Sequence, residues 1–236
     1  MKHICVFFEK RLANVKKKQY LCGRFGKKVQ KLSDIWFRMW SNAWFLVRSR
    51  NTLGYGIHSP HLFYIARMIL PERAQYYCFE ELRNYGITKL QHYGTAERKK
   101  NETLFRLVSF MKAETIVEVG AKDDVRTKYL QAPNSKARVL TPEAVQVSGF
   151  KFHVPGTVDF AVMSATEGEI CFERLAKLAE EKSLFVVDDI RENKANWQVW
   201  KAIEASENVS ARIDLGQMGL VFFNPHFPKQ TFRIRV

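Results

Sequence analysis

The sequence predicts an α/β fold with a mostly parallel sheet, and three observations support this prediction. Short apolar segments typical of buried strands alternate with helical segments between residues 113 and 205. Such alternation implies parallel strands covered by helices on both faces of the sheet. The chain then closes with three apolar segments joined by short connections, which predicts antiparallel strands at the C-terminal side. Helical segments precede the first strand and predict a helical N-terminal extension.

The positive charge of the chain is concentrated in its N-terminal segment. Residues 1–52 hold 13 Lys/Arg and 2 Asp/Glu, whereas the remaining residues hold 25 Lys/Arg and 22 Asp/Glu. The net charge of the whole chain is +14. A surface for an anionic partner is therefore expected in this segment. We divide the chain into a basic, Trp-rich segment (1–52), a helical lead-in (53–112) and an α/β core (113–236).

A helix with an aromatic stripe is predicted within KLSDIWFRMWSNAWFLVRSR, residues 31–50. Its apolar residues at helical spacing are Ile35, Trp36, Met39, Trp40, Ala43, Trp44 and Val47. We favour docking of this stripe on the domain or, as a homodimer through residues 31–48, on a second subunit. Tryptophans on a basic helix also suit an anionic membrane surface. Nucleic acid is not expected, because the segment lacks the scattered strand aromatics that base stacking favours.

GYGIHSPHLFYIARMIL contains a helix start. Ser59 is predicted to accept a hydrogen bond from the first turn, and Pro60 suits the first helical position, where no N–H is needed. Pro71 ends the helix. His58 and His61 flank the cap, and we favour capping or pocket lining over a metal site.

The remaining elements follow in order. Helices are predicted at 96–111, 124–132, 169–180 and 194–205, and strands at 115–119, 137–141, 150–154 (weak), 158–163, 183–190, 209–215, 219–223 and 231–236.

Cysteine usage and hydropathy predict a cytoplasmic protein. Cys5, Cys22, Cys78 and Cys171 lie far apart, so reduced thiols are expected. The N-terminal apolar run is too short for a signal peptide, and no segment is long enough to span a membrane. A peripheral location on the inner face of the membrane is expected if the basic segment binds lipid.

Several motifs give the chain a family resemblance. They are GYGIHSPHLF, ETLFRLVSFMKAETIVEVG, LFVVDDI and IDLGQMGLVFF followed by KQTFRIRV. With these motifs, residues 50–236 resemble bacterial class I S-adenosylmethionine (SAM) dependent methyltransferase-like proteins, related to small O-methyltransferases. Residues 1–49 have no counterpart in that family.

The resemblance implies a Rossmann-like methyltransferase fold with SAM bound over the carboxyl ends of the strands. It implies that Glu118, Gly120 and Ala121 open the cofactor turn, that Glu143 holds the ribose hydroxyls and that Ser164 lies beside the cofactor. The reaction would transfer a methyl group to an oxygen or nitrogen of an unknown small-molecule or lipid acceptor.

Three departures from the family pattern indicate an altered site. Asp124 stands where the family has its second glycine, although Asp123 or Asp124 also suits a helix cap. The connection after residue 141 is too short for a full crossover helix. Ser164 replaces the family's aspartate at the end of its strand.

Asp188 and Asp189 are the candidate catalytic residues, because the resemblance places them at the carboxyl end of a strand. Paired carboxylates bind Mg²⁺ with a third oxygen ligand, which Glu167 or Glu169 would have to supply. We favour helix capping and a salt bridge to a nearby basic side chain such as Arg191, and we predict no metal site.

Two functions follow from these observations. The first is a SAM-dependent methyltransferase with a divergent cofactor loop and impaired activity. The alternative is a catalytically degenerate methyltransferase-fold protein that acts as a binding or scaffold module, at the membrane surface through its basic N-terminal segment.

Overall fold

A computed structural model describes the fold. The described residues are 32–49, 54, 56–90, 93–120, 123–141 and 156–235. The weak strand expected at 150–154 lies outside them, as do Ala121 and Glu143.

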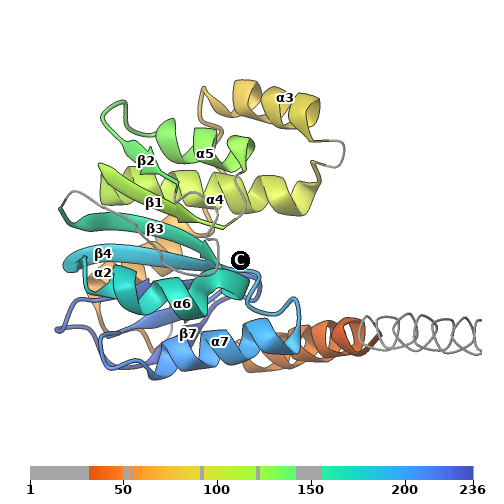
Figure 1. Cartoon of the computed structure of the whole chain (residues 1–236), viewed down its shortest axis with the longest axis vertical. Coiled ribbons are helices and arrows are strands. Elements are labelled where there is room, and N and C mark those ends of the chain that lie inside the picture. The colour runs from red at the N-terminus through yellow and green to blue at the C-terminus, as the bar shows by residue number, and fades with distance from the viewer. Residues whose placement is uncertain are drawn as a thin grey trace, which may run out of the picture.

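The described residues form a seven-stranded sheet in the order β2-β1-β3-β4-β6-β5-β7 (Figure 1). The strands are β1 (Thr115–Val119), β2 (Arg138–Leu140), β3 (Val158–Ser164), β4 (Ala179–Asp188), β5 (Arg212–Asp214), β6 (Gly219–Phe222) and β7 (Thr231–Arg233). β2, β1, β3 and β4 are mutually parallel. This order and pairing define the Rossmann-like fold of class I methyltransferases, so the predicted fold class is confirmed.

The C-terminal strands differ in one pairing from the expectation. β6 runs antiparallel to both β4 and β5, as predicted. β7 pairs with β5 in parallel, so the expectation that it too is antiparallel was wrong. In the sheet, β5 lies between β6 and β7. The chain therefore crosses β5 after β6 and adds β7 at the outer edge of the sheet.

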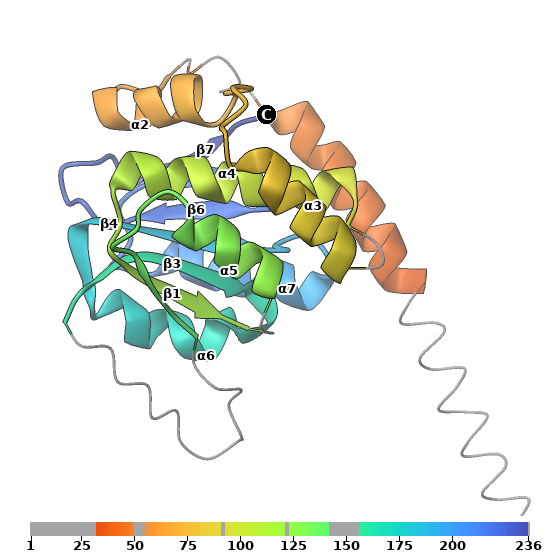
Figure 2. The same ribbon diagram turned by 90° about the horizontal axis from the view of Figure 1, so that it is seen from above.

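Helices cover both faces of the sheet, as the alternation predicted (Figure 2). One face packs against α2 (Pro60–Tyr64), the π-helical turn Ile65–Ile69 that continues it, and α4 (Thr95–Met111). The other face packs against α6 (Ala165–Ala176) and α7 (Lys194–Ala205). Each face therefore has its own apolar core.

Two helices differ from the predicted pattern. α3 (Phe79–Lys89) was not predicted, because it buries only Phe79, Leu82 and Gly86 and its apolar periodicity is weak. α6 begins four residues before the predicted start and ends at Ala176, because β4 begins at Ala179. α5 (Asp124–Gln131) agrees with the prediction.

The predicted helix start at Ser59 is confirmed. The Ser59 hydroxyl accepts a hydrogen bond from the Leu62 backbone N–H at 3.5 Å, and Pro60 is the first helical residue. The helical turns end before Pro71. His58 is exposed, and the His61 ring lies against Phe110.

Residues 32–48 form a helix that packs on the body through a face other than the aromatic stripe. Phe45 is 6% exposed and Ser41 is 7% exposed, and Asn42 accepts a hydrogen bond from Gln217 at 3.4 Å. The expected docking of the tryptophan stripe on its own domain was therefore wrong. Within the described residues, no helix combines the length and apolarity needed to cross a bilayer.

Candidate functional site

The carboxyl ends of β1 and β3 mark the expected ligand site of this sheet. β1 lies between β2 and β3, so the chain turns to one side of the sheet after β1 and returns on the other side with β3. In open α/β sheets such a switch point leaves a crevice outside the strand ends. Gly120 follows β1 and Ser164 ends β3, so two predicted site residues lie here.

Gly120 has a conformation and a setting that suit the close approach of a ligand. Its φ of +123° lies in a region that side-chain-bearing residues rarely adopt. A Cβ on Gly120 would lie 3.6 Å from the Ser164 Cβ, which is ordinary van der Waals contact. The backbone rather than crowding therefore requires glycine, and Gly120 and Ser164 are direct neighbours.

Glu118 is committed to an internal interaction. Its carboxylate is fully buried and accepts hydrogen bonds from Arg126 Nε at 2.7 Å and from Thr127 Oγ1 at 2.6 Å. Burial alone would lower the pKa of Arg126, but the Glu118 carboxylate outweighs burial and raises it. Glu118 thus holds α5 against β1.

The two aspartates after the cofactor turn serve the start of α5. Asp123 Oδ1 accepts hydrogen bonds from the backbone N–H groups of Val125 at 3.0 Å and Arg126 at 3.2 Å, which confirms the capping interpretation for Asp123. Asp124 is the first residue of α5. Asp124 thus has a helical conformation. The left-handed conformation that the family's glycine at this position permits is therefore not needed here.

Asp188 and Asp189 share a partner that the sequence did not reveal. Lys100 Nζ lies 2.9 Å from Asp188 Oδ1 and 2.7 Å from Asp189 Oδ1. The expected capping role was wrong, because Asn193 caps α7. The expected partner Arg191 was also wrong: it pairs with Asp214, and the two aspartates pair with Lys100 of α4.

Asp189 also carries backbone strain. Its φ of 57° is left-handed, a conformation that costs about 1–3 kcal/mol in a residue with a side chain. Its carbonyl oxygen accepts a hydrogen bond from Asn196 Nδ2 at 2.9 Å. This contact and the contact with Lys100 hold the turn in place. Such strain is commonly found at functional sites.

The carboxyl edge of the sheet carries more acidic than basic groups around Lys100. Burial raises the pKa of Asp188, and the Lys100 ammonium opposes this effect. Burial also raises the pKa of Glu97, and the neighbouring Asp188, Asp189 and Asp123 raise it further. Two basic side chains, Lys100 and Arg126, thus stand among five carboxyl groups, those of Glu97, Glu118, Asp123, Asp188 and Asp189.

The side chains at this edge do not fit a divalent cation. Both aspartates face the Lys100 ammonium, which a cation would have to displace. Among the described residues, no group of three or more His, Cys, Asp or Glu side chains could hold a metal ion. From the side chains that the structure describes, Mg²⁺ would therefore lack both a free carboxylate pair and a third ligand.

The described part of the site does fit a sulfonium nucleoside such as SAM. Gly120 leaves its backbone open beside Ser164, so a nucleoside can approach the chain closely there. Ala121 and the predicted ribose ligand Glu143 lie outside the described residues.

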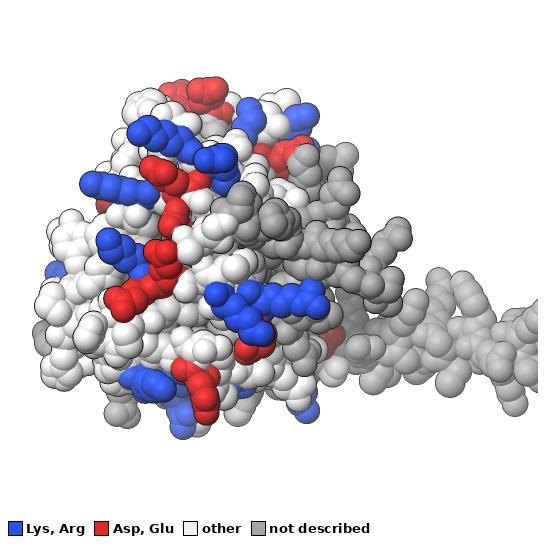
Figure 3. Space-filling model, turned by 60° about the vertical axis from the view of Figure 1, so that its left-hand side comes forward, with Lys and Arg blue, Asp and Glu red and all other residues white. Residues whose placement is uncertain are grey.

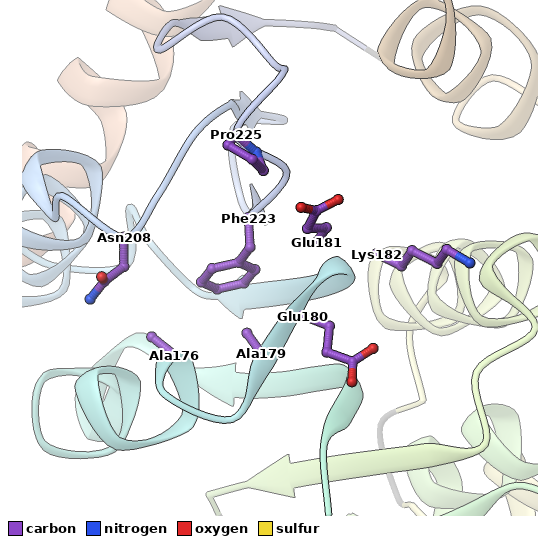
Figure 4. A pocket seen from close by; sticks show the side chains of 8 residues that line it. All are labelled: Ala176, Ala179, Glu180, Glu181, Lys182, Asn208, Phe223 and Pro225. Atoms are coloured by element: carbon purple, nitrogen blue, oxygen red, sulfur yellow. The ribbon is translucent and has the colours of Figure 1, made fainter.

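A pocket among the described residues lies at the other end of the sheet. Its volume is about 650 Å³, and its lining includes Glu180 and Lys182 at the amino end of β4 and Phe223 after β6 (Figure 4). The Phe223 ring points into this pocket. It shares no residue with the predicted site, and we place the candidate site at the carboxyl edge because strain and paired charges are found there.

His61 lines a second pocket near the amino ends of the strands. This pocket has a volume of about 340 Å³ and includes Phe110 and Phe227, whose rings flank His61. Burial lowers the pKa of His61. His61 therefore lines a pocket, but this pocket is not at the Gly120 edge, and its role as a substrate pocket stays a prediction.

Similar solved structures are small O-methyltransferases from bacteria. An O-methyltransferase from Bacillus cereus in complex with SAH is 15% identical with a TM-score of 0.46, and the match covers 68% of this chain and 96% of that chain. A putative caffeoyl-CoA O-methyltransferase from Staphylococcus aureus is 11% identical with a TM-score of 0.49, covering 63% and 93%. A putative O-methyltransferase from Klebsiella pneumoniae is 10% identical with a TM-score of 0.47, covering 64% and 92%.

No protein-family model and no curated protein sequence matches the chain. We assign the fold from the order and pairing of the strands.

Proposed function

We propose that the chain is a SAM-binding protein of methyltransferase fold that transfers a methyl group to an oxygen or nitrogen acceptor without a divalent metal. The observation that carries this proposal is Gly120, left-handed and open beside Ser164 at the switch point of the sheet. Bound SAM would supply an electrophilic methyl group.

The side chains of the carboxyl edge suggest roles in such a transfer. The Asp189 side chain is 37% exposed, whereas that of Asp188 is 9% exposed. Asp189 is therefore the group that can take the proton of an acceptor hydroxyl or amine. Lys100 holds the Asp189 carboxylate in place. Catalysis of this kind depends chiefly on positioning, with a base assisting deprotonation of the acceptor.

The alternative, a catalytically degenerate binding or scaffold protein, also has support in the contacts. Glu118 is occupied by Arg126 and Thr127, and the Asp188 and Asp189 pair is occupied by Lys100. Side chains that are saturated from within the fold are less available to a ligand. This function predicts no affinity for SAM.

Titration calorimetry with SAM and with SAH separates the two functions. We expect binding of both ligands by the wild type and its loss in Gly120→Ala, where a Cβ opposes both the backbone conformation and close ligand approach. Saturating ligand at about 100 times its Kd should add about 2.7 kcal/mol to the free energy of unfolding.

Gly156→Ala is the matched control. Gly156 also has positive φ, +95°, but it precedes β3 at the opposite edge of the sheet. Each variant should lose about 1–3 kcal/mol of stability through backbone strain, and only Gly120→Ala should lose the ligand. Absence of binding by the wild type at millimolar SAM would refute the proposal and leave the alternative function.

A further inference from the structure

The helix at residues 32–48 presents an unusually apolar face to its surroundings. Its exposed fractions include 72% for Trp36, 65% for Met39, 60% for Trp40 and 75% for Val47. The exposed apolar residues of this face are Leu32, Ile35, Trp36, Met39, Trp40, Trp44, Leu46 and Val47. Contiguous apolar surface of this kind marks an interaction site.

The packed face of the same helix is polar in part, which is the reverse of an ordinary surface helix. Ser41 and Asn42 lie against the body beside Phe45. The Phe45 ring lies 4.8 Å from the Arg191 guanidinium, and Arg191 forms a buried ion pair with Asp214. The body therefore fixes the helix with its apolar face outward.

The aromatic residues of this face form an ordered group. The rings of Trp40 and Trp44 stack with centroids 5.6 Å apart, and the Arg48 guanidinium lies 4.5 Å over the Trp44 ring. Tryptophan rings beside basic side chains are typical of helices that lie in the interface between lipid headgroups and acyl chains.

Charge selects among the surfaces that could cover this face. Residues 1–31, which lead directly into the helix, contain ten Lys/Arg and one Asp/Glu. The face of the body drawn in Figure 3 carries Lys/Arg and Asp/Glu side by side, without a broad acidic patch among its described residues. A second copy of the chain, with a net charge of +14, does not complement the basic segment.

We propose that the helix at 32–48 lies in the surface of an anionic lipid bilayer, with Trp36, Trp40 and Trp44 at headgroup level. A partner bound through charge alone would leave the exposed apolar side chains in water, and the positive charge of residues 1–31 selects anionic over neutral lipid. The proposal goes beyond methyl transfer and does not depend on it.

Membrane contact would orient the candidate site. The helix contacts Gly216 and Gln217, which connect β5 to β6, and Arg191, which follows β4. These residues lie at the same carboxyl edge as Asp188 and Asp189. A bilayer under the helix would therefore lie toward the edge of the sheet that carries the site.

Vesicle co-sedimentation of the full chain tests the proposal. We expect binding to phosphatidylcholine vesicles that contain phosphatidylglycerol, little binding to phosphatidylcholine alone, and weakening of binding in 0.5 M salt as the charges are screened. The triple variant W36S/W40S/W44S should bind at least about tenfold more weakly because it loses the apolar anchors. The triple variant K16E/K17E/K18E should also lose at least about tenfold on anionic vesicles.

The matched control changes three exposed apolar residues elsewhere. M68S/Y77S/I87S replaces side chains that are 53%, 94% and 65% exposed on the body, and it should bind vesicles like the wild type. Circular dichroism and the urea midpoint verify that each variant is folded. A wild type that ignores anionic vesicles overturns the proposal, and so does a stable dimer that W36S/W40S/W44S dissociates, or a loss of binding that is equal in the control.

Discussion

Lys100 and Arg191 show how single side chains tie distant parts of this protein together. Lys100 of α4 holds both aspartates at the carboxyl end of β4, across 88 and 89 positions of sequence. Arg191 donates to both carboxylate oxygens of Asp214 at 2.7 and 2.5 Å and also to the Gly216 carbonyl. Removing one partner of such a buried pair costs more than the pair contributes, because the other charge stays buried.

Lys100→Met should therefore destabilise the protein by about 3 kcal/mol at pH 8, because Asp188 would stay buried without its cation. Urea unfolding followed by circular dichroism measures the loss. Lys99→Met is the matched control, since Lys99 is exposed on the same helix, and it should change stability by less than about 0.5 kcal/mol. Equal effects of the two variants would contradict the assigned role of Lys100.

The ion pairs of Lys100 with Asp188 and Asp189 also predict that the stability of the protein depends on pH. Burial alone lowers the pKa of Lys100, but the carboxylates outweigh burial and raise it above its ordinary 10.5. A basic group whose pKa is higher in the folded protein than in the unfolded chain stabilises the fold. This stabilisation is complete below the pKa of the unfolded chain and is lost as pH rises above that value. The stability difference between wild type and Lys100→Met should be constant from pH 8 to pH 10 and should narrow above pH 10.5. A difference that is unchanged at pH 11.5 or above would contradict this pairing.

At the scale of the element, the helix at 32–48 depends on a small contact area. Phe45 packs on Gly216, where an added Cβ would lie 3.1 Å from the ring, and on the Arg191 guanidinium. The tryptophans on the outer face contribute little to this attachment. The orientation of the helix thus depends on one aromatic side chain and its immediate neighbours.

Phe45→Ala should release the helix without unfolding the sheet. The buried ring would leave a cavity, so local attachment should weaken by about 3 kcal/mol or more. Limited proteolysis within residues 32–49 should become faster, while the urea midpoint of the core changes little. Val47→Ala, at a position 75% exposed, is the control and should be cut at the wild-type rate. Protection of Phe45→Ala equal to the wild type would refute the packing contact.

For the molecule as a whole, one sheet separates two large apolar cores, and a third, smaller apolar cluster lies among α3, α4 and α5. Consecutive residues of β4 point to opposite faces, with Leu184 in the core under α4 and Phe185 in the core under α6 and α7. Both side chains are fully buried. Because the faces share the same strands, we expect them to unfold together.

Leu184→Ala should lower the free energy of unfolding by about 2–5 kcal/mol, and Phe185→Ala should lower it by about 3–5 kcal/mol. Both losses should appear in the same unfolding transition. Circular dichroism and tryptophan fluorescence should report coincident urea curves for each variant. A variant that melts one face and leaves the other folded would show two transitions and would contradict the single cooperative unit.

Local pattern in the sequence was sufficient for most elements of the fold. Strand–helix alternation predicted the parallel sheet, the Ser59-Pro60 pair predicted a helix start, and Asp123 was among the predicted caps. These features depend on neighbours within a few residues, so the chain carries their signal locally. α3 escaped prediction because it buries few residues and shows little apolar periodicity.

The amino-acid sequence by itself determined the fold class, the open glycine after β1 and the uneven charge of the chain. Only the tertiary structure decided which groups meet: Lys100 with Asp188 and Asp189, Arg126 with Glu118, and Phe45 rather than the tryptophans with the body. Helical periodicity shows that a face is apolar, but it does not show whether that face turns toward the core or away from it. That outcome depends on the packing of residues far apart in the chain, which no local pattern contains.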